Sequence, residues 1–322
     1  MGADLRFRCM GTWAHVIVSG GPRGLGDVVR ARLSELEKRW SRFIPSSELM
    51  QLNAAAGRFF PVSPETLLLI RRGVQGWHQT RGLFDPTMLG ALIRAGYDRD
   101  FDLISRPGAA QDGATEIGGG CQDILVFGNF VWLPAATGFD SGGIGKGLAA
   151  DIAAREAMEA GADGVLVNLG GDLCARGSSP EGSGWTVSVE HPQLDGPLVL
   201  VGLMEGAIAT STTLLRRWSV ADEVRHHLID PGTGLPAVTD VGLATVVARD
   251  AWHAEVLAKA LVLSRSQDPL AELVGTGAEG LVVRQGGEVI YSEGFADFVG
   301  DQALPDLLAL EDQWAPSRTP GS

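Results

Sequence analysis

The sequence predicts an α+β fold in which helices flank a large, mainly antiparallel sheet. Short runs rich in β-branched residues, typical of strands, alternate with longer runs whose apolar residues recur at three- and four-residue steps, typical of amphipathic helices. No linker cleanly divides this succession into two parts. The 322 residues are 45% hydrophobic and 20% charged, so the chain is long and apolar enough to bury a sizeable core.

The N-terminal half begins with a strand-like stretch and continues with two helices. The stretch "RFRCMGTWAHVIVSG" combines β-branched residues with partial alternation of apolar and polar side chains, which favours a strand. Apolar residues at helical spacing predict a helix over 24–40. A second helix is expected from Ser63, followed by Pro64 in its first turn, to about Thr80. Residues 105–121, rich in glycine and alanine without a period, are predicted to be a surface loop.

The rest of the chain continues the alternation. Strands are predicted at "DILVFG", "FVWLP", "GVLVNLGG", "WTVSVEHP", "LVLVGL" and "VGLATVVA", with a helix over 147–160 after the second of them. Further helices are expected over 252–264 and 268–275, followed by a hairpin, "EGLVVR…GEVIYS". Residues 1–300 are therefore predicted to form a single domain, and residues 301–322 a loosely held tail.

Composition and cysteine spacing argue against several kinds of partner and site. The net charge of −13 argues against nucleic acid, because a nucleic-acid surface needs clustered lysine and arginine. Three widely spaced cysteines, Cys9, Cys121 and Cys174, favour reduced thiols over a disulfide framework or a thiolate metal site. No signal peptide is visible and no apolar run approaches the length of a membrane span, so we expect a cytoplasmic protein with no membrane partner.

The stretch "DSGGIGKGLAAD" at residues 140–151 has the composition of a phosphate-binding loop. It does not match the nucleoside-triphosphate motif G-x-x-x-x-G-K-[ST], because Asp140 stands at the first glycine and Gly147 at the hydroxyl residue. It does not match G-x-G-x-x-G either, because Leu148 takes the last position. Two interpretations stay open: a tight turn that leads into a helix, or an anion site made of helix N-terminal amides and Lys146.

Seven short segments occur along the chain in a particular order. They are "CMGTWAHV", "SRFIPSSELMQLNAAAG", "GLFDPTMLGALIRAGYD", "DSGGIGKGLAAD", "VNLGGDLCARG", "AIATSTT" and "HHLIDPGTGLP". Together they resemble the FAD:protein FMN transferases, the ApbE-type flavinyltransferases, over about residues 7–290. The resemblance implies an ApbE-like, T-fold-related architecture and a single FAD-binding domain. It also implies an enzyme that binds FAD with Mg²⁺, joins the FMN part to a Ser or Thr hydroxyl of a target protein with a flavinylation motif, and releases AMP.

The resemblance also implies roles for particular residues. The residues that would contact FAD are Met10, Phe43, Leu83, Phe84, Asp85, Asp140, Lys146 and Ile229. Gly143 would offer a backbone carbonyl to Mg²⁺, and His227 would be the general base for the target hydroxyl, a role that suits the pKa of histidine. Structural alternatives remain: Met10 and Phe43 as core residues, Asp85 as a helix cap, and His227 as a turn histidine like its neighbour His226.

The stretch "HAEVLAKAL" at residues 253–261 departs from the family pattern. The family places an Asp and, four residues later, a Thr on one helix face as Mg²⁺ ligands, whereas this chain has Glu255 and Lys259. The resemblance therefore assigns Glu255, which can still bind Mg²⁺, to the metal site, but a protonated Lys259 cannot be a ligand. Either the two form an ion pair on the helix surface, or the Lys259 ammonium takes the place of the metal and contacts the FAD diphosphate. Two functions follow: a flavinyltransferase with altered or absent Mg²⁺ dependence, or an FAD-binding protein that has lost the transfer reaction or been recruited to different chemistry.

Overall fold

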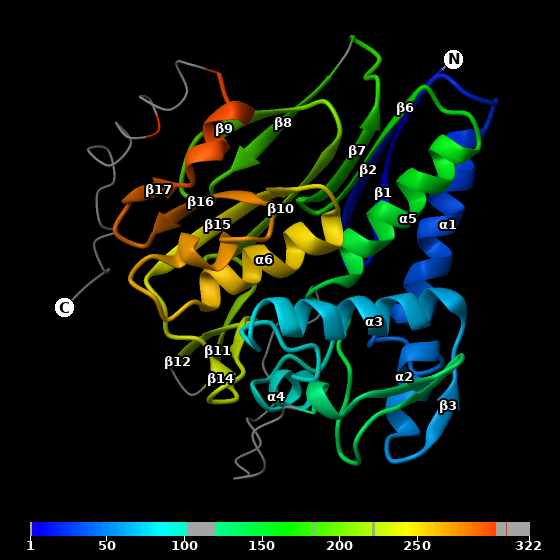
Figure 1. The fold of residues 1–322 in the computed structure, drawn as a ribbon, viewed down its shortest axis with the longest axis vertical. Coiled ribbons are helices and arrows are strands. Elements are labelled where there is room, and N and C mark those ends of the chain that lie inside the picture. The colour runs from blue at the N-terminus through cyan, green and yellow to red at the C-terminus, as the bar shows by residue number, and fades with distance from the viewer. Residues whose placement is uncertain (1, 102–119, 183, 221–222, 301–306, 308–322) are drawn as a thin grey trace.

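An eight-stranded sheet forms the centre of the computed structural model (Figure 1). In hydrogen-bonding order its strands are β1 (Ala3–Cys9), β2 (Thr12–Ser19), β6 (Gly164–Leu169), β7 (Asp172–Gly177), β10 (Gly206–Thr212), β15 (Val241–Ala248), β16 (Glu279–Arg284) and β17 (Val289–Tyr291). Every neighbouring pair is antiparallel, which confirms the predicted sheet. The stretch expected to be one strand is a hairpin, because Met10 and Gly11 between β1 and β2 both adopt a positive φ and form a tight turn.

The structure describes residues 2–101, 120–182, 184–220, 223–300 and Leu307. Most of the predicted loop 105–121 lies outside these residues, and so does the tail 301–322 apart from Leu307. No helix in these described ranges has the length and apolar character that a bilayer crossing requires.

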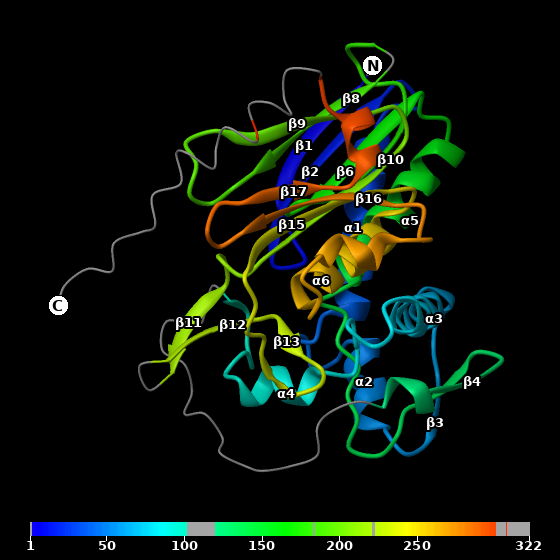
Figure 2. The same ribbon diagram turned by 60° about the vertical axis from the view of Figure 1, so that its left-hand side comes forward.

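Three helices cover one face of the sheet, and a β-hairpin covers the other (Figure 2). The helices are α1 (Leu25–Trp40), α5 (Gly145–Glu159) and α6 (Ala251–Leu263), and the hairpin is β8 (Trp185–Glu190) with β9 (Pro197–Leu203). Because α6 packs on the sheet, on α5 and on α3, only His253, Lys259 and Leu263 of its side chains are not buried. A charged residue of α6 therefore lies inside the fold or at a cavity.

The remaining elements gather at one end of the sheet, in the lower part of Figure 1. They are α2 (Glu48–Ala54), α3 (Pro64–Gln79), α4 (Leu89–Arg94), the small sheet of β3 (Phe59–Pro61), β5 (Phe130–Trp132) and β4 (Leu125–Phe127), and the pairs β11 (Arg217–Val220) with β12 (Glu223–His226) and β13 (Ile229–Asp230) with β14 (Leu235–Pro236). The helix expected over 268–275 is a short 3₁₀ helix, Pro269–Leu273, in which the Asp268 side chain accepts a hydrogen bond from the Leu270 amide.

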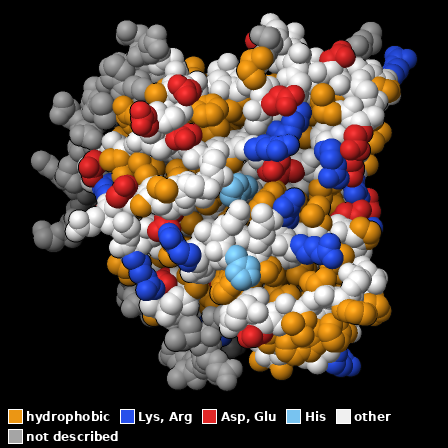
Figure 3. All heavy atoms as spheres, viewed as in Figure 1, with side chains coloured by type: hydrophobic (Ala, Val, Ile, Leu, Met, Phe, Trp, Pro, Cys, Tyr) orange, Lys and Arg blue, Asp and Glu red, His pale blue; other side chains and the backbone are white. Residues whose placement is uncertain are grey.

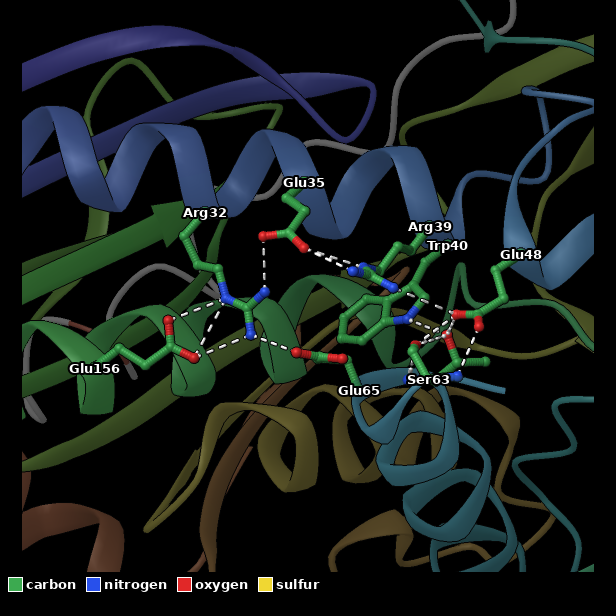
Figure 4. Close-up of polar contacts among 9 residues, drawn as sticks. Arg32, Glu35, Arg39, Trp40, Glu48, Ser63, Glu65 and Glu156 are labelled. Atoms are coloured by element: carbon green, nitrogen blue, oxygen red, sulfur yellow. Dashed lines mark hydrogen bonds and ion pairs between the residues drawn. The ribbon is translucent and has the colours of Figure 1, made fainter. Parts of the chain in front are cut away.

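A polar network joins α1 to α3 and α5 (Figure 4). The Arg32 guanidinium contacts Glu156 of α5 at 3.0 Å and Glu65 of α3 at 2.8 Å. Nearer the end of α1, Glu48 accepts hydrogen bonds from the amide and the hydroxyl of Ser63, the N-cap of α3. At the C-terminal end of α1, Arg39 lies 3.9 Å from Glu48 and the Trp40 indole donates a hydrogen bond to the Thr66 hydroxyl at 3.2 Å. These contacts hold the end of α1 that contributes to the cavity described below.

An apolar patch lies on the small three-stranded sheet, at the lower right of Figure 3. Phe59, Leu125, Phe127 and Phe130 are 52%, 53%, 78% and 41% exposed. None of these four side chains lines the cavity, so the patch is separate from the candidate site.

Candidate active site

A cavity of about 310 Å³ is lined by residues of α1, α4, α5, α6 and β13 and of the loops that connect them. The sequence-predicted residues that line it are Met10, Phe43, Leu83, Phe84, Asp85, Asp140, Gly143, Lys146, His227, Ile229 and Lys259. Glu255 lies beneath the wall and does not reach the cavity surface. Residues that are distant in sequence are thus gathered around one space.

Lys146, at the start of α5, lies between two buried carboxylates. Its ammonium pairs with Asp172 and lies 3.0 Å from Glu255 Oε1, while Glu255 Oε2 accepts a hydrogen bond from the Gly147 amide at 2.8 Å. Burial lowers the pKa of Lys146, but the charges of Asp172 and Glu255 outweigh burial and raise it. Burial raises the pKa of Asp172 to about 6. No role was predicted for Asp172, although it falls in one of the seven family-like segments.

Lys259 reaches across the cavity wall to the loop that precedes α5. Its ammonium donates a hydrogen bond to the Gly142 carbonyl at 2.9 Å. A Cβ on Gly143 would lie 2.5 Å from the Lys259 nitrogen and 2.8 Å from Phe84 Cε2, so the glycine leaves room for the lysine. Burial lowers the pKa of Lys259, and the nearby Glu255 charge opposes this. Since Glu255 pairs with Lys146, the alternative of a surface ion pair between Glu255 and Lys259 does not hold.

The donor set does not suit Mg²⁺, which prefers oxygen ligands in octahedral geometry. Both carboxylate oxygens of Glu255 are engaged by Lys146 and the Gly147 amide. The Lys259 ammonium donates a hydrogen bond to the Gly142 carbonyl. This carbonyl is adjacent in sequence to the Gly143 carbonyl that the resemblance assigned to the metal. Across the described residues, no group of three or more His, Cys, Asp or Glu side chains could hold a metal ion. A divalent cation would meet a positive charge here rather than ligands.

His227 follows β12 and faces the cavity. Its Nδ1 is buried and lacks a hydrogen-bond partner in the described part of the chain. Burial lowers the pKa of His227 well below the usual value, and the positive charge of Arg216 lowers it further. The neighbouring His226 turns away and contacts the Ala237 carbonyl at 3.0 Å, which is a structural role. A neutral imidazole with a free nitrogen is suited to accept a proton.

One end of the cavity is aromatic. Phe43 and Tyr97 lie with ring centroids 6.0 Å apart, and the Arg42 guanidinium lies 4.4 Å from the Phe43 ring and 4.2 Å from the Tyr97 ring. Arg42 also pairs with Asp140 at 3.4 Å. Sequence reasoning missed Arg42 and Tyr97, although both fall in family-like segments. A planar ring system would find stacking partners at this end.

Two predicted residues take part in hydrogen bonds between a backbone amide and a carboxylate. Asp85 accepts a hydrogen bond from the Thr87 amide at 2.7 Å, and burial raises its pKa. It does not cap a helix, because the N-cap of α4 is Met88. Met10 lines the cavity with a φ of 52°, and its amide donates to Glu37 at 2.6 Å. Both contacts shape the cavity wall.

The choice of basic residue is also informative. The chain has three lysines, Lys38, Lys146 and Lys259, and two of them meet at this cavity. Arginine serves elsewhere for nearly every basic position. Both of these lysines lie beside the glycine loop that lines the cavity. A compact ammonium fits such a narrow space better than a guanidinium does.

Comparison with known proteins gives consistent results. The ApbE family model matches residues 10–281. An FAD:protein FMN transferase of Klebsiella pneumoniae is 27% identical over 92% of this chain and 86% of its own length. The crystal structure of the ApbE protein of Thermotoga maritima superposes with a TM-score of 0.83 at 27% identity, over 94% of this chain and 100% of that one. A flavinyl transferase ApbE of Pseudomonas stutzeri gives 0.79 at 23% identity, over 93% and 97% of the two chains. The resemblance and the ApbE-like architecture predicted from the sequence are confirmed.

Proposed function

Because the chain belongs to the ApbE family, we propose that it is a flavinyltransferase that moves FMN from FAD to a Ser or Thr hydroxyl of a target protein and releases AMP. The observation that carries this proposal is the convergence on one cavity of Lys146, Lys259 and His227, whose pKa is lowered and whose Nδ1 has no hydrogen-bond partner among the described residues. Anionic phosphorus chemistry needs both a base for the attacking hydroxyl and positive charge on the phosphates.

In the proposed reaction the oxygen of the target hydroxyl attacks the phosphorus on the FMN side of the diphosphate, and His227 takes the proton of that hydroxyl. A new P–O bond joins FMN to the target, the P–O bond to the AMP half breaks, and AMP leaves with that electron pair. Lys146 and Lys259 lie where they can neutralise the phosphate oxygens. Phe43 and Tyr97 offer ring faces for the flavin or the adenine.

We further propose that the Lys259 ammonium stands in place of the metal. It supplies one positive charge at the glycine loop, held by the Gly142 carbonyl, where the resemblance implied Mg²⁺. Unlike a metal ion it cannot bind several phosphate oxygens at once in a fixed geometry. Because the ammonium supplies positive charge where the metal would, we expect the enzyme to work without added metal.

The test combines the purified chain, FAD and a target protein with a flavinylation motif, in Mg²⁺ or in EDTA. We expect flavin attached to the target in both conditions, with rates that agree within about twofold, because no step depends on the metal. In-gel flavin fluorescence and intact mass measure attachment. No attachment in either condition, while FAD still binds, would reject flavinyl transfer and favour an FAD-binding protein that has lost the reaction.

Restoring the family's ligand types should restore a response to metal. In the variant Lys259→Thr with Glu255→Asp, we expect the rate with Mg²⁺ to exceed the rate in EDTA by about tenfold or more, because the diphosphate loses the ammonium and gains oxygen ligands beside it. The ratio of the two rates is the measurement. The exposed Lys38→Thr variant is the control and should behave as the wild type. A double variant whose rate ignores Mg²⁺ would contradict the substitution of lysine for metal.

The pH dependence of the transfer rate should show that the base, His227, stays neutral to a lower pH than an ordinary histidine. Burial and the nearby charges lower the pKa of His227; those charges are on Arg216, Lys259, His226 and Lys146. Only the neutral ring accepts a proton, so activity is present above the lowered pKa and is lost as pH falls through it. We expect kcat/KM for FAD, measured from pH 4.5 to 8, to fall only below about 6.5, the value for an unperturbed histidine. An inflection at or above that value would contradict the environment described for His227.

A further inference from the structure

Arg216 is a residue of the cavity wall that neither the sequence pattern nor the proposed reaction has used. It lies between β10 and β11, is half-buried, and lines the cavity together with Lys146 and His227. Its backbone has a φ of 48°, a left-handed conformation that non-glycine residues rarely adopt. Residues held in such conformations cluster at functional sites, because only surrounding contacts or a functional need sustain the cost.

Among the described residues around the cavity, no carboxylate pairs with Arg216. Arg42 pairs with Asp140, and Lys146 pairs with Asp172 and Glu255. Within the described ranges, neither Arg216 nor Lys259 forms an ion pair with a carboxylate. The positive charge of Arg216 lowers the pKa of Lys146 and the pKa of His227, two groups that are cationic when protonated. A half-buried guanidinium that pairs with no carboxylate of the described residues favours the binding of an anion.

We propose that Arg216 binds the diphosphate of FAD and stabilises the charge that develops on the departing AMP phosphate. The inference rests on the proposed function. As the hydroxyl oxygen bonds to phosphorus on the FMN side and its proton passes to His227, the breaking P–O bond leaves its electron pair on an AMP phosphate oxygen. The guanidinium fork of Arg216 donates hydrogen bonds to that oxygen, while Lys259 faces the other side of the diphosphate. Two cations without ion-pair partners match the two negative charges of the diphosphate.

The experiment compares Arg216→Gly, Arg216→Lys and Arg217→Ala in the full chain. Glycine accepts a φ of 48° without strain, so Arg216→Gly should fold at least as well as the wild type. Arg217 is the matched control, since it is adjacent, exposed and absent from the cavity lining. FAD affinity is measured by quenching of flavin fluorescence, and turnover by AMP release with FAD and a target protein.

We expect Arg216→Gly to lower kcat about 10²- to 10³-fold and to weaken FAD binding about tenfold, and Arg217→Ala to change either by less than about twofold. Arg216→Lys should recover part of kcat, and added guanidinium should raise kcat of Arg216→Gly but not of Arg217→Ala. If Arg216→Gly matches Arg217→Ala in kcat and in FAD affinity, the inference is overturned. If the wild type itself releases no AMP, the proposed transfer fails. The test of Arg216 then rests on FAD affinity alone, and equal affinity in Arg216→Gly and Arg217→Ala overturns the inference.

Discussion

Replacing His227 by glutamine should lower kcat for FMN transfer by about 10²- to 10⁴-fold, the range that a general base contributes. Glutamine keeps the approximate size of the ring and its hydrogen-bonding capacity but cannot take a proton at neutral pH. Because His227 lines the cavity, we expect the loss to fall on the chemical step. Single-turnover transfer of FMN to a target protein measures it, and FAD affinity should change by less than about threefold, since the phosphates are held by other residues.

The adjacent His226→Gln variant is the matched control. His226 contacts the Ala237 carbonyl at 3.0 Å and does not line the cavity. Its Nδ1 also accepts a hydrogen bond from the Leu228 amide at 3.3 Å. Its replacement should cost about 1–2 kcal/mol of the free energy of unfolding, as expected for two hydrogen bonds, with a rate within about threefold of the wild type. Equal losses of rate in the two variants would show that this turn acts through its shape, and that His227 is not the base.

Replacing Lys146 by methionine should be the most destabilising of the site substitutions. It removes the positive charge between Asp172 and Glu255, whose side chains are 4% and 2% exposed. Removing one partner of a buried ion pair typically costs about 3–5 kcal/mol, because the remaining charge is left uncompensated. Urea denaturation at pH 7.5 measures the loss. FAD binding should fall as well, since the ammonium also faces the cavity.

The deficit of the Lys146→Met variant should shrink in acid. Burial already raises the pKa of Asp172 to about 6, and the loss of the lysine, which lowers it, raises it further. A carboxyl whose pKa is raised by folding binds more protons in the native state, so its cost is present at high pH and is relieved as pH falls through the raised value. Denaturation at pH 5.5 should therefore recover part of the lost stability.

Two further variants complete this test. Asp172→Asn with Glu255→Gln in the Lys146→Met background should regain most of the stability at pH 7.5, because no uncompensated charge remains. Lys38→Met, an exposed lysine, should leave stability within about 0.5 kcal/mol of the wild type. A Lys146→Met protein as stable as the Lys38→Met protein would contradict the ion pairs described at the start of α5.

Most of the fold followed from local patterns. The helix from Ser63 is an example: the serine side chain accepts from the Thr66 amide, and proline follows it in the first turn, as the sequence predicted. The elements that were missed include two strands of the central sheet, β7 and β10, as well as the six-residue α4 and the hairpin turn at Met10 and Gly11. Such elements depend on packing against neighbours more than on their own periodicity.

The sequence by itself determined the fold class, the family and eleven of the residues that line the cavity, because these depend on residue type and order. Only the tertiary structure decided which charges meet. Glu255 pairs with Lys146, 109 positions away, rather than with Lys259 on its own helix, and Lys259 binds a carbonyl 117 positions away. The close packing of α5 on α6 brings these groups together, and a helix buried on most sides directs its charged residues to partners on other elements. For the same reason Arg216 became visible as a site residue only in the folded chain.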